Sequence, residues 1–153
     1  ALLLLAKRFR RAGLTLQRGF VERLAARAGS PDDGRFTVMV HHKSTVELAG
    51  LIRKESFRPV PRVDSAVVVI QRKRPEVPVK SERLFGEVVR FLFTQRKKKA
   101  KKVLRQYLET LGRGNAAIQT VSHLPDARVF QLKVSDFERR SNEISEMRRE
   151  RVE

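Results

Sequence analysis

Apolar residues in the second half of the chain recur at the three- and four-residue spacing of one helix face. The second of these periodic runs ends at Gly112-Arg113-Gly114, which is typical of a helix stop, and Asn115 then suits an N-cap. Ser135 and Glu138 have the spacing of a capping box, which indicates where a last helix begins. The predicted helices are 82–93, about 98–111, 116–124 and one from Ser135 toward Arg149.

The first half of the chain mixes helical patterns with runs of β-branched residues. Its predicted strands are Leu14–Gln17, Val46–Ile52 and Ala66–Gln71. The last run is apolar without a break from Ala66 to Ile70, so we expect this strand to be covered on both faces of a sheet. Helices are predicted over Ala1–Ala12 and Phe20–Ala28, whereas Phe36–His42 suits either a strand, which its β-branched residues favour, or two helical turns.

A segment with two prolines separates the two halves. Residues 74–80 read Arg-Pro-Glu-Val-Pro-Val-Lys, and proline interrupts helices and sheet ladders because it has no backbone N–H to donate. We therefore divide the chain into an α/β portion at 1–74, a linker at 75–80 and a helical subdomain at 81–153.

Composition describes a folded and strongly basic protein. Of the 153 residues, 41% are hydrophobic and 33% are charged, which is apolar enough for a buried core. The 34 Lys and Arg residues outnumber 17 Asp and Glu, so the formal net charge is +17 and a nucleic acid is the leading expected partner. The absence of cysteine excludes disulfides, a thiolate nucleophile and cysteine-based zinc sites, and it fits a reducing compartment such as the cytoplasm.

Membrane, metal and nucleophile chemistry find little support in the residues. The apolar opening Ala1–Ala6 is far shorter than the roughly 20 residues of a membrane-spanning helix, and basic residues follow it rather than precede it as in a signal peptide. The histidines His41, His42 and His123 lack carboxylates at suitable spacing, so no metal site is expected. Ser65 is not part of a Gly-x-Ser-x-Gly elbow.

Because the chain starts with Ala rather than Met, we expect a piece of a longer protein.

The stretch Phe57–Ser65 carries two prolines one residue apart. Pro59 and Pro61 fix their own φ angles, push the residues before them toward extended conformations and remove two backbone donors. We therefore predict a stiff, irregular lead-in to the strand at Ala66, which holds Phe57 near the sheet edge. The alternative is that Phe57 fills the core beneath a loop, as aromatic side chains commonly do.

The most strongly charged stretch runs from Arg96 to Lys102, where six of seven residues are basic. Their mutual repulsion is unfavourable on an isolated helix, and binding to phosphates would remove it and release counterions. We expect these side chains to bind a nucleic-acid backbone without reading its sequence, the alternative being a solvated surface. The candidate residues are Arg96, Lys97, Lys98, Lys99, Lys101 and Lys102.

Several segments together resemble the rRNA adenine dimethyltransferases, also called dimethyladenosine transferases. Residues Phe57–Val68 read Phe-x-Pro-x-Pro-x-Val-Asp-Ser-Ala-Val-Val, which is similar to the hallmark of that family. Residues Phe93–Lys98 resemble its Phe-x-x-Arg-Arg-Lys segment. Other segments similar to the family are Gln17 with Phe20–Ala26, Gly29–Arg35, and Arg128–Leu132 with Phe137, the last resembling the ending of the archaeal version.

This resemblance implies an α/β fold, namely the C-terminal half of a class I (Rossmann-like) methyltransferase sheet with a small all-helical C-terminal subdomain. It also implies that Phe36–His42 is a helix. The family transfers methyl groups from S-adenosylmethionine to two adjacent, flipped-out adenines near the 3′ end of small-subunit rRNA, on the pre-30S particle. Phe57 would stack on an adenine, beside a basic shelf on which Arg96, Lys97 and Lys98 hold rRNA phosphates. We expect a monomer.

The chain also departs from the family. Gly19 stands where the family has Glu, and Asp33 where it has Tyr. The Gly-rich cofactor loop and the catalytic Asn-x-Pro-Tyr have no counterpart, because neither Asn115 nor Asn142 precedes a Pro-aromatic pair. We therefore expect a fragment that binds rRNA, has no catalytic or cofactor-binding residues of its own and does not methylate. We also expect its sheet strands to be poorly stable without their neighbours.

Two other functions stay open. The first is a non-catalytic RNA-binding ribosome assembly factor that lacks the cofactor half, which a start codon at this point in the gene would favour. The second is a mitochondrial-type transcription factor of the same descent. That function would be supported if duplex promoter DNA competed for binding better than rRNA fragments.

Overall fold

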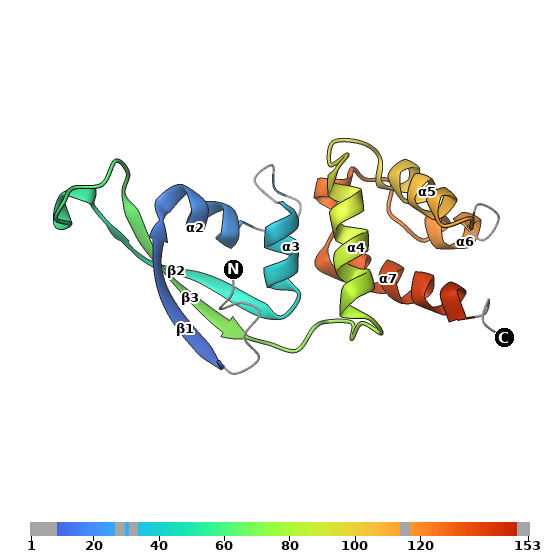
Figure 1. The fold of residues 1–153 in the computed structure, drawn as a ribbon, viewed down its shortest axis with the longest axis horizontal. Coiled ribbons are helices and arrows are strands. Elements are labelled where there is room, and N and C mark those ends of the chain that lie inside the picture. Colours follow the sequence, from blue (N-terminus) through green and yellow to red (C-terminus); the bar gives the residue numbers. More distant parts are fainter. Residues whose placement is uncertain (1–8, 27–29, 31–33, 114–116, 150–153) are drawn as a thin grey trace.

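The computed structural model describes residues 9–26, 30, 34–113 and 117–149. Within these ranges a small sheet lies toward one end of the molecule and a group of helices lies at the other (Figure 1). No helix in the described ranges is both long enough and apolar enough to cross a membrane.

The sheet has three strands in the order β1-β3-β2, namely β1 (Arg11–Gln17), β2 (Ser44–Ile52) and β3 (Ser65–Arg72). Because β3 pairs antiparallel with both neighbours, the three predicted strands are confirmed, each longer than expected. The helix predicted over 1–12 is wrong at its end, since Arg11 and Ala12 pair with Gln71 and Ile70; residues 1–8 lie outside the described ranges. Pairing with an apolar central strand outweighs a short helical pattern.

Helices α2 (Arg18–Ala25) and α3 (Arg35–His41) lie over one face of the sheet (Figure 1). The ambiguous segment is thus a helix, as the family resemblance implied. On the opposite face of β3, Val67 and Val69 stay partly exposed, so the prediction of a strand covered on both faces is wrong for the described part of the chain. The buried side chains of the sheet layer are Val21, Leu24, Val40, Ala66, Val68 and Ile70.

The second part of the molecule is helical, and its elements confirm the predicted helices to within two residues at each described end. The predicted stop after the second helix is also confirmed, because Gly112 has φ 68° and the Arg113 N–H donates to the Leu108 carbonyl at 2.9 Å. The elements are α4 (Glu82–Phe93), α5 (Ala100–Thr110), α6 (Ala117–Ser122), the 3-10 helix η2 (Val129–Gln131) and α7 (Val134–Arg149).

The start of α7 differs from the prediction. Ser135 and Glu138 do not form the expected capping box, because the helix already begins at Val134 and the Asp136 carboxylate accepts the Lys133 N–H at 2.9 Å. Glu138 is instead 1% exposed and hydrogen-bonds to two other segments of the chain. The role of Glu138 is decided by a distant buried contact, which local spacing cannot reveal.

Helix α3 contributes to both hydrophobic cores. Val40 packs with the sheet layer, whereas Val38 packs with the helical core around Phe85 and Phe137. We call β1–β3 with α2 and α3 the sheet part, and α4–α7 with η2 the helical part. Because one short helix takes part in both layers, the sheet part and the helical part share a packed contact. The boundaries at residues 74 and 81 remain predictions from the sequence.

Candidate nucleic-acid interface

The turn between α4 and α5 carries the predicted basic cluster, and a later segment holds it in place. Lys99 and Arg128 form an antiparallel β-bridge. Next to it, the Val129 N–H donates to the Lys98 carbonyl at 3.1 Å. These backbone bonds fix the course of the turn, so its charged side chains extend from an ordered surface.

The basic side chains of this turn differ in their exposure to solvent. Lys97, Lys98 and Lys102 are exposed, and Lys101 is partly buried. Arg128 is exposed as well, and the β-bridge places it beside the cluster. Sequence reasoning missed this arginine, whose only signal was its position at the start of a family-like segment. We call Lys97, Lys98, Lys102 and Arg128 the basic surface.

Two of the predicted residues have partners within the protein. The guanidinium carbon of Arg96 lies 5.7 Å from the centre of the Phe130 ring, a cation–π contact that also covers part of the ring. Lys99 Nζ lies 2.8 Å from Asp126 Oδ2. That hydrogen bond and the lysine charge lower the pKa of the Asp126 carboxyl. Arg96 and Lys99 therefore support the turn as well as adding positive charge.

The connection between β2 and β3 carries the other predicted site. It begins with the 3-10 helix η1 (Lys54–Ser56), after which Phe57 is partly buried and belongs to neither described hydrophobic cluster. Arg58 Nη1 donates to the Phe57 carbonyl at 3.1 Å, and the Arg58–Pro59 peptide is cis. Pro59 is exposed and Pro61 partly buried. Phe57 thus fills neither core, and its ring remains accessible in part.

An open cleft of about 460 Å³ lies next to this connection, at the start of α2. Glu22 accepts a 2.7 Å hydrogen bond from Arg18, which raises the pKa of that arginine, and Asp64 Oδ1 accepts the Lys54 N–H at 3.0 Å. Three cationic side chains outnumber the two carboxylates of this cleft, so its charge does not fit S-adenosylmethionine, whose sulfonium is repelled by cations. The charged residues that line the cleft are Arg18, Glu22, Lys54, Arg62 and Asp64.

Phe57 and the basic surface do not lie side by side. The β2–β3 connection projects from the sheet at one end of the molecule, whereas the α4–α5 turn lies beyond α2 and α3 on the helical part (Figure 1). The expectation of a ring beside a basic shelf is therefore wrong. As for metals, no group of three or more His, Asp or Glu side chains in the described residues is arranged to hold an ion.

The comparisons of this chain with known proteins agree on one family. Residues 2–146 match the model of the ribosomal RNA adenine dimethylase family. The ribosomal RNA small subunit methyltransferase A of Nitrosomonas europaea is 43% identical over 94 residues, which are 61% of this chain and 37% of that protein. The probable ribosomal RNA small subunit methyltransferase A of Thermococcus kodakarensis is 36% identical over 139 residues, covering 87% of this chain and 49% of that protein. The chain thus spans half or less of the length of these relatives.

Solved structures share the fold. A dimethyladenosine transferase from Plasmodium falciparum superposes with a TM-score of 0.77 at 21% identity, covering 97% of this chain and 61% of that one. The 23S rRNA methyltransferase ErmE superposes with a TM-score of 0.61 at 21% identity, covering 93% of this chain and 57% of that one. The sheet and helices described above therefore form part of a Rossmann-like methyltransferase fold.

Proposed function

The chain belongs to the ribosomal RNA adenine dimethylase family, and on that premise we propose that it is the rRNA-binding portion of an S-adenosylmethionine-dependent adenine dimethyltransferase. The parent enzyme would dimethylate two adjacent adenines near the 3′ end of small-subunit rRNA during ribosome assembly. The observation that carries the proposal is the ordered basic surface, since a chain of net charge +17 presents exposed cations there. We further propose a monomer that acts in the cytoplasm on the pre-30S particle.

The two predicted sites would contact different parts of the RNA. Lys97, Lys98, Lys102 and Arg128 would hold phosphates, which positions the RNA without reading its sequence. Phe57 would stack on the extruded target adenine, and Pro59 and Pro61 would limit the movement of its segment. Support for this assignment comes from the partial exposure of Phe57 and from its place in a connection outside both described cores.

Methyl transfer is proposed for the parent protein and not for these 153 residues alone. The chain has no Asn-x-Pro-Tyr segment, and its charged cleft next to β3 does not fit the methyl donor. A second candidate function, a non-catalytic ribosome assembly factor, would bind rRNA through the same surface. Incubation of the chain with labelled S-adenosylmethionine and small-subunit RNA should give no labelled product, and labelling would contradict this part of the proposal.

The decisive test is the salt dependence of RNA binding. In the double variant Lys97→Ala with Lys98→Ala, we expect weaker binding to all RNA sequences and a slope of log K against log salt that is flatter by about one to two units, because each lost phosphate contact removes about 0.7–0.9 of a unit. Fluorescence anisotropy with a small-subunit rRNA fragment measures both quantities.

The matched control removes the same charge elsewhere. Lys73 and Lys133 are exposed and lie outside the basic surface, so their double alanine variant should change the slope much less. Equal slopes for the two double variants would mean that the effect is one of net charge, and the proposed surface would be wrong. Duplex DNA serves as a competitor, and stronger competition by DNA than by unlabelled rRNA would also contradict the proposal.

A further inference from the structure

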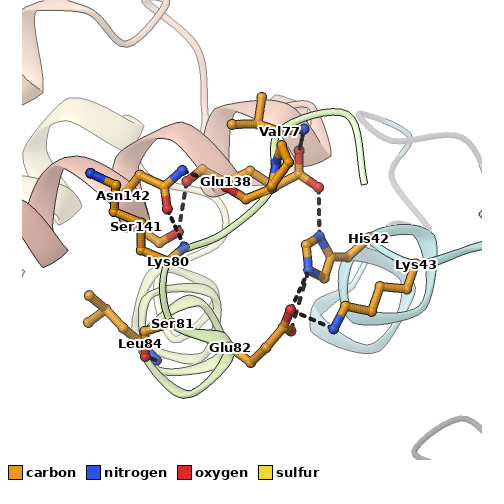
Figure 2. Close-up of polar contacts among 11 residues, drawn as sticks. His42, Lys43, Val77, Lys80, Ser81, Glu82, Leu84, Glu138, Ser141 and Asn142 are labelled. Carbon is orange, nitrogen blue, oxygen red and sulfur yellow. Dashed lines mark hydrogen bonds and ion pairs between the residues drawn. The ribbon is translucent and has the colours of Figure 1, made fainter. Parts of the chain in front are cut away.

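One buried carboxylate connects three segments where the sheet part meets the helical part. Glu138 of α7 is 1% exposed, and its Oε1 lies 2.6 Å from Nδ1 of His42, the residue that follows α3 (Figure 2). Its other oxygen accepts the Val77 N–H at 2.9 Å. Glu138 therefore joins the end of α3, the proline segment at 75–80 and α7.

His42 is itself held on every side. It is 2% exposed, and its ring centre lies 4.2 Å from that of Phe85 on α4. Its Nε2 lies 3.4 Å from the carboxylate of Glu82, which in turn pairs with Lys43 at 2.5 Å (Figure 2). The histidine thus sits between two carboxylates of the helical part, and both of its nitrogens face an acceptor.

The proline segment is attached to the same helix. The Lys80 N–H donates to Asn142 Oδ1 at 2.7 Å, and Asn142 Nδ2 donates to the Pro78 carbonyl at 2.9 Å. The side chain of Lys80 also pairs with Glu146. Residues 77–80 are therefore bound along α7, and they do not act as a free tether between the two parts.

Hydrophobic contact is non-directional, so it does not by itself fix the angle between the sheet part and the helical part. The apolar contacts that α3 makes through Val38 and Val40 are of this kind. Hydrogen bonds between buried charged groups are directional, and breaking one partner leaves a buried group unsatisfied. The His42–Glu138 pair is thus suited to select one orientation of the sheet part against the helical part.

We propose that His42 and Glu138 are positioning residues that fix the distance between the Phe57 connection and the basic surface, so that one folded rRNA engages both at once. The identity of the ligand in this inference rests on the proposed function. The fixed orientation of the two parts does not depend on it. Two sites held at a set separation act as a bivalent binder, whose affinity for a long RNA exceeds that of either site.

The chain contains no cysteine, so a pair of spin labels can be introduced without removing any residue that reacts with them. Ser56→Cys reports on the Phe57 connection and Arg105→Cys on α5, and both positions are exposed. Double electron–electron resonance should give one narrow distance distribution in the parent protein. With His42→Leu and Glu138→Leu the distribution should broaden or shift, because an apolar pair still packs but has no directional bond.

A matched control uses the same residue types within the helical part. His123 Nδ1 lies 3.7 Å from Glu143 Oε1, so this pair joins the residue after α6 to α7 within the helical part. His123→Leu with Glu143→Leu should leave the distribution narrow. If the His42 double variant does not fold by circular dichroism, Glu138→Gln takes its place, since an amide keeps the volume but has only one acceptor for His42 and Val77.

RNA affinity separates this inference from the proposed function. In the His42 double variant we expect a loss of about tenfold or more for a structured small-subunit rRNA fragment and less than about twofold for a short oligonucleotide that reaches only the basic surface. An unchanged distance distribution would overturn the inference, as would equal losses for the two RNAs. If the parent chain binds neither RNA, the proposed function fails, and the distance measurement still decides whether the pair sets the orientation.

Discussion

The sheet part and the helical part differ in how completely they bury their apolar residues. The helical core contains Phe85, Leu104 and Phe137 at 0% exposure and is enclosed by helices on several sides. The sheet layer has only a small buried cluster on one face, and β1 and β2 each pair with β3 alone in the described residues. More of the folding free energy should therefore come from the helical part.

The exposed large apolar side chains point to the same difference. Within the described ranges, all of them lie in the sheet part, on the helices, strands and loop that precede residue 64: Phe20, Phe36, Met39, Leu48, Leu51, Val60 and Val63. In its described residues the helical part shows none of these, and its core takes in one buried side chain from α3, Val38. The sheet part, which leaves large apolar side chains exposed, is therefore less self-sufficient as a folding unit than the helical part.

The largest expected effect comes from matched cavities in the two cores. Leu104→Ala in the helical core should lower the free energy of unfolding by about 4–5 kcal/mol, and Leu24→Ala in the sheet layer by about 2–3 kcal/mol, because a thin layer relaxes more easily around a cavity. Urea unfolding followed by circular dichroism measures both losses. A loss for Leu24→Ala as large as that for Leu104→Ala would contradict the comparison.

A smaller effect is expected at the start of α4. Ser81 Oγ accepts the Leu84 N–H at 3.2 Å, whereas Gln17, the residue before α2, makes no side-chain cap. Ser81→Ala should cost about 1 kcal/mol of unfolding free energy, the typical value for a lost N-cap. Ser81→Asp serves as the control and should retain most of the stability, while a full loss in both variants would show that the cap is not the cause.

The smallest expected effect is on the titration of Asp126, which pairs with Lys99 beside the basic surface. Because Lys99 lowers the pKa of Asp126 in the folded state, this pair stabilises the protein above the unfolded pKa of Asp, and that contribution is lost as the pH falls through the lowered folded pKa. Carbon-detected NMR titration should place the Asp126 midpoint below that of an ordinary Asp, and Lys99→Ala should return it toward that value. An unchanged midpoint in Lys99→Ala would mean that another group shifts it.

Much of the fold could be predicted because it depends on local sequence. The helix at 82–93 has a regular apolar face and a serine before it, and its bounds were predicted without error. The strand at Ala66–Gln71 could be predicted because its β-branched run is distinctive over a few residues. The first predicted helix is wrong at its end, because the pairing of Arg11 and Ala12 with β3 comes from residues far along the chain.

The candidate site was only partly predictable for the same reason. The charge of Lys97, Lys98 and Lys102 is visible in the sequence, since the lysines are neighbours. Arg128 joins them through a β-bridge to Lys99, and nothing in its local sequence indicates that bridge. The separation of Phe57 from the basic surface was likewise invisible, because it depends on how α3 packs between the two parts.

The sequence by itself determined the element types, the excess of positive charge and the family segments, since each of these depends on residues close together in the chain. Only the tertiary structure decided which carboxylate is buried and what it holds. The two residues of the His42–Glu138 pair are 96 positions apart, and their contact exists because α3 and α7 pack against the same core. Long-range packing places such groups, and no local pattern encodes the distance between them.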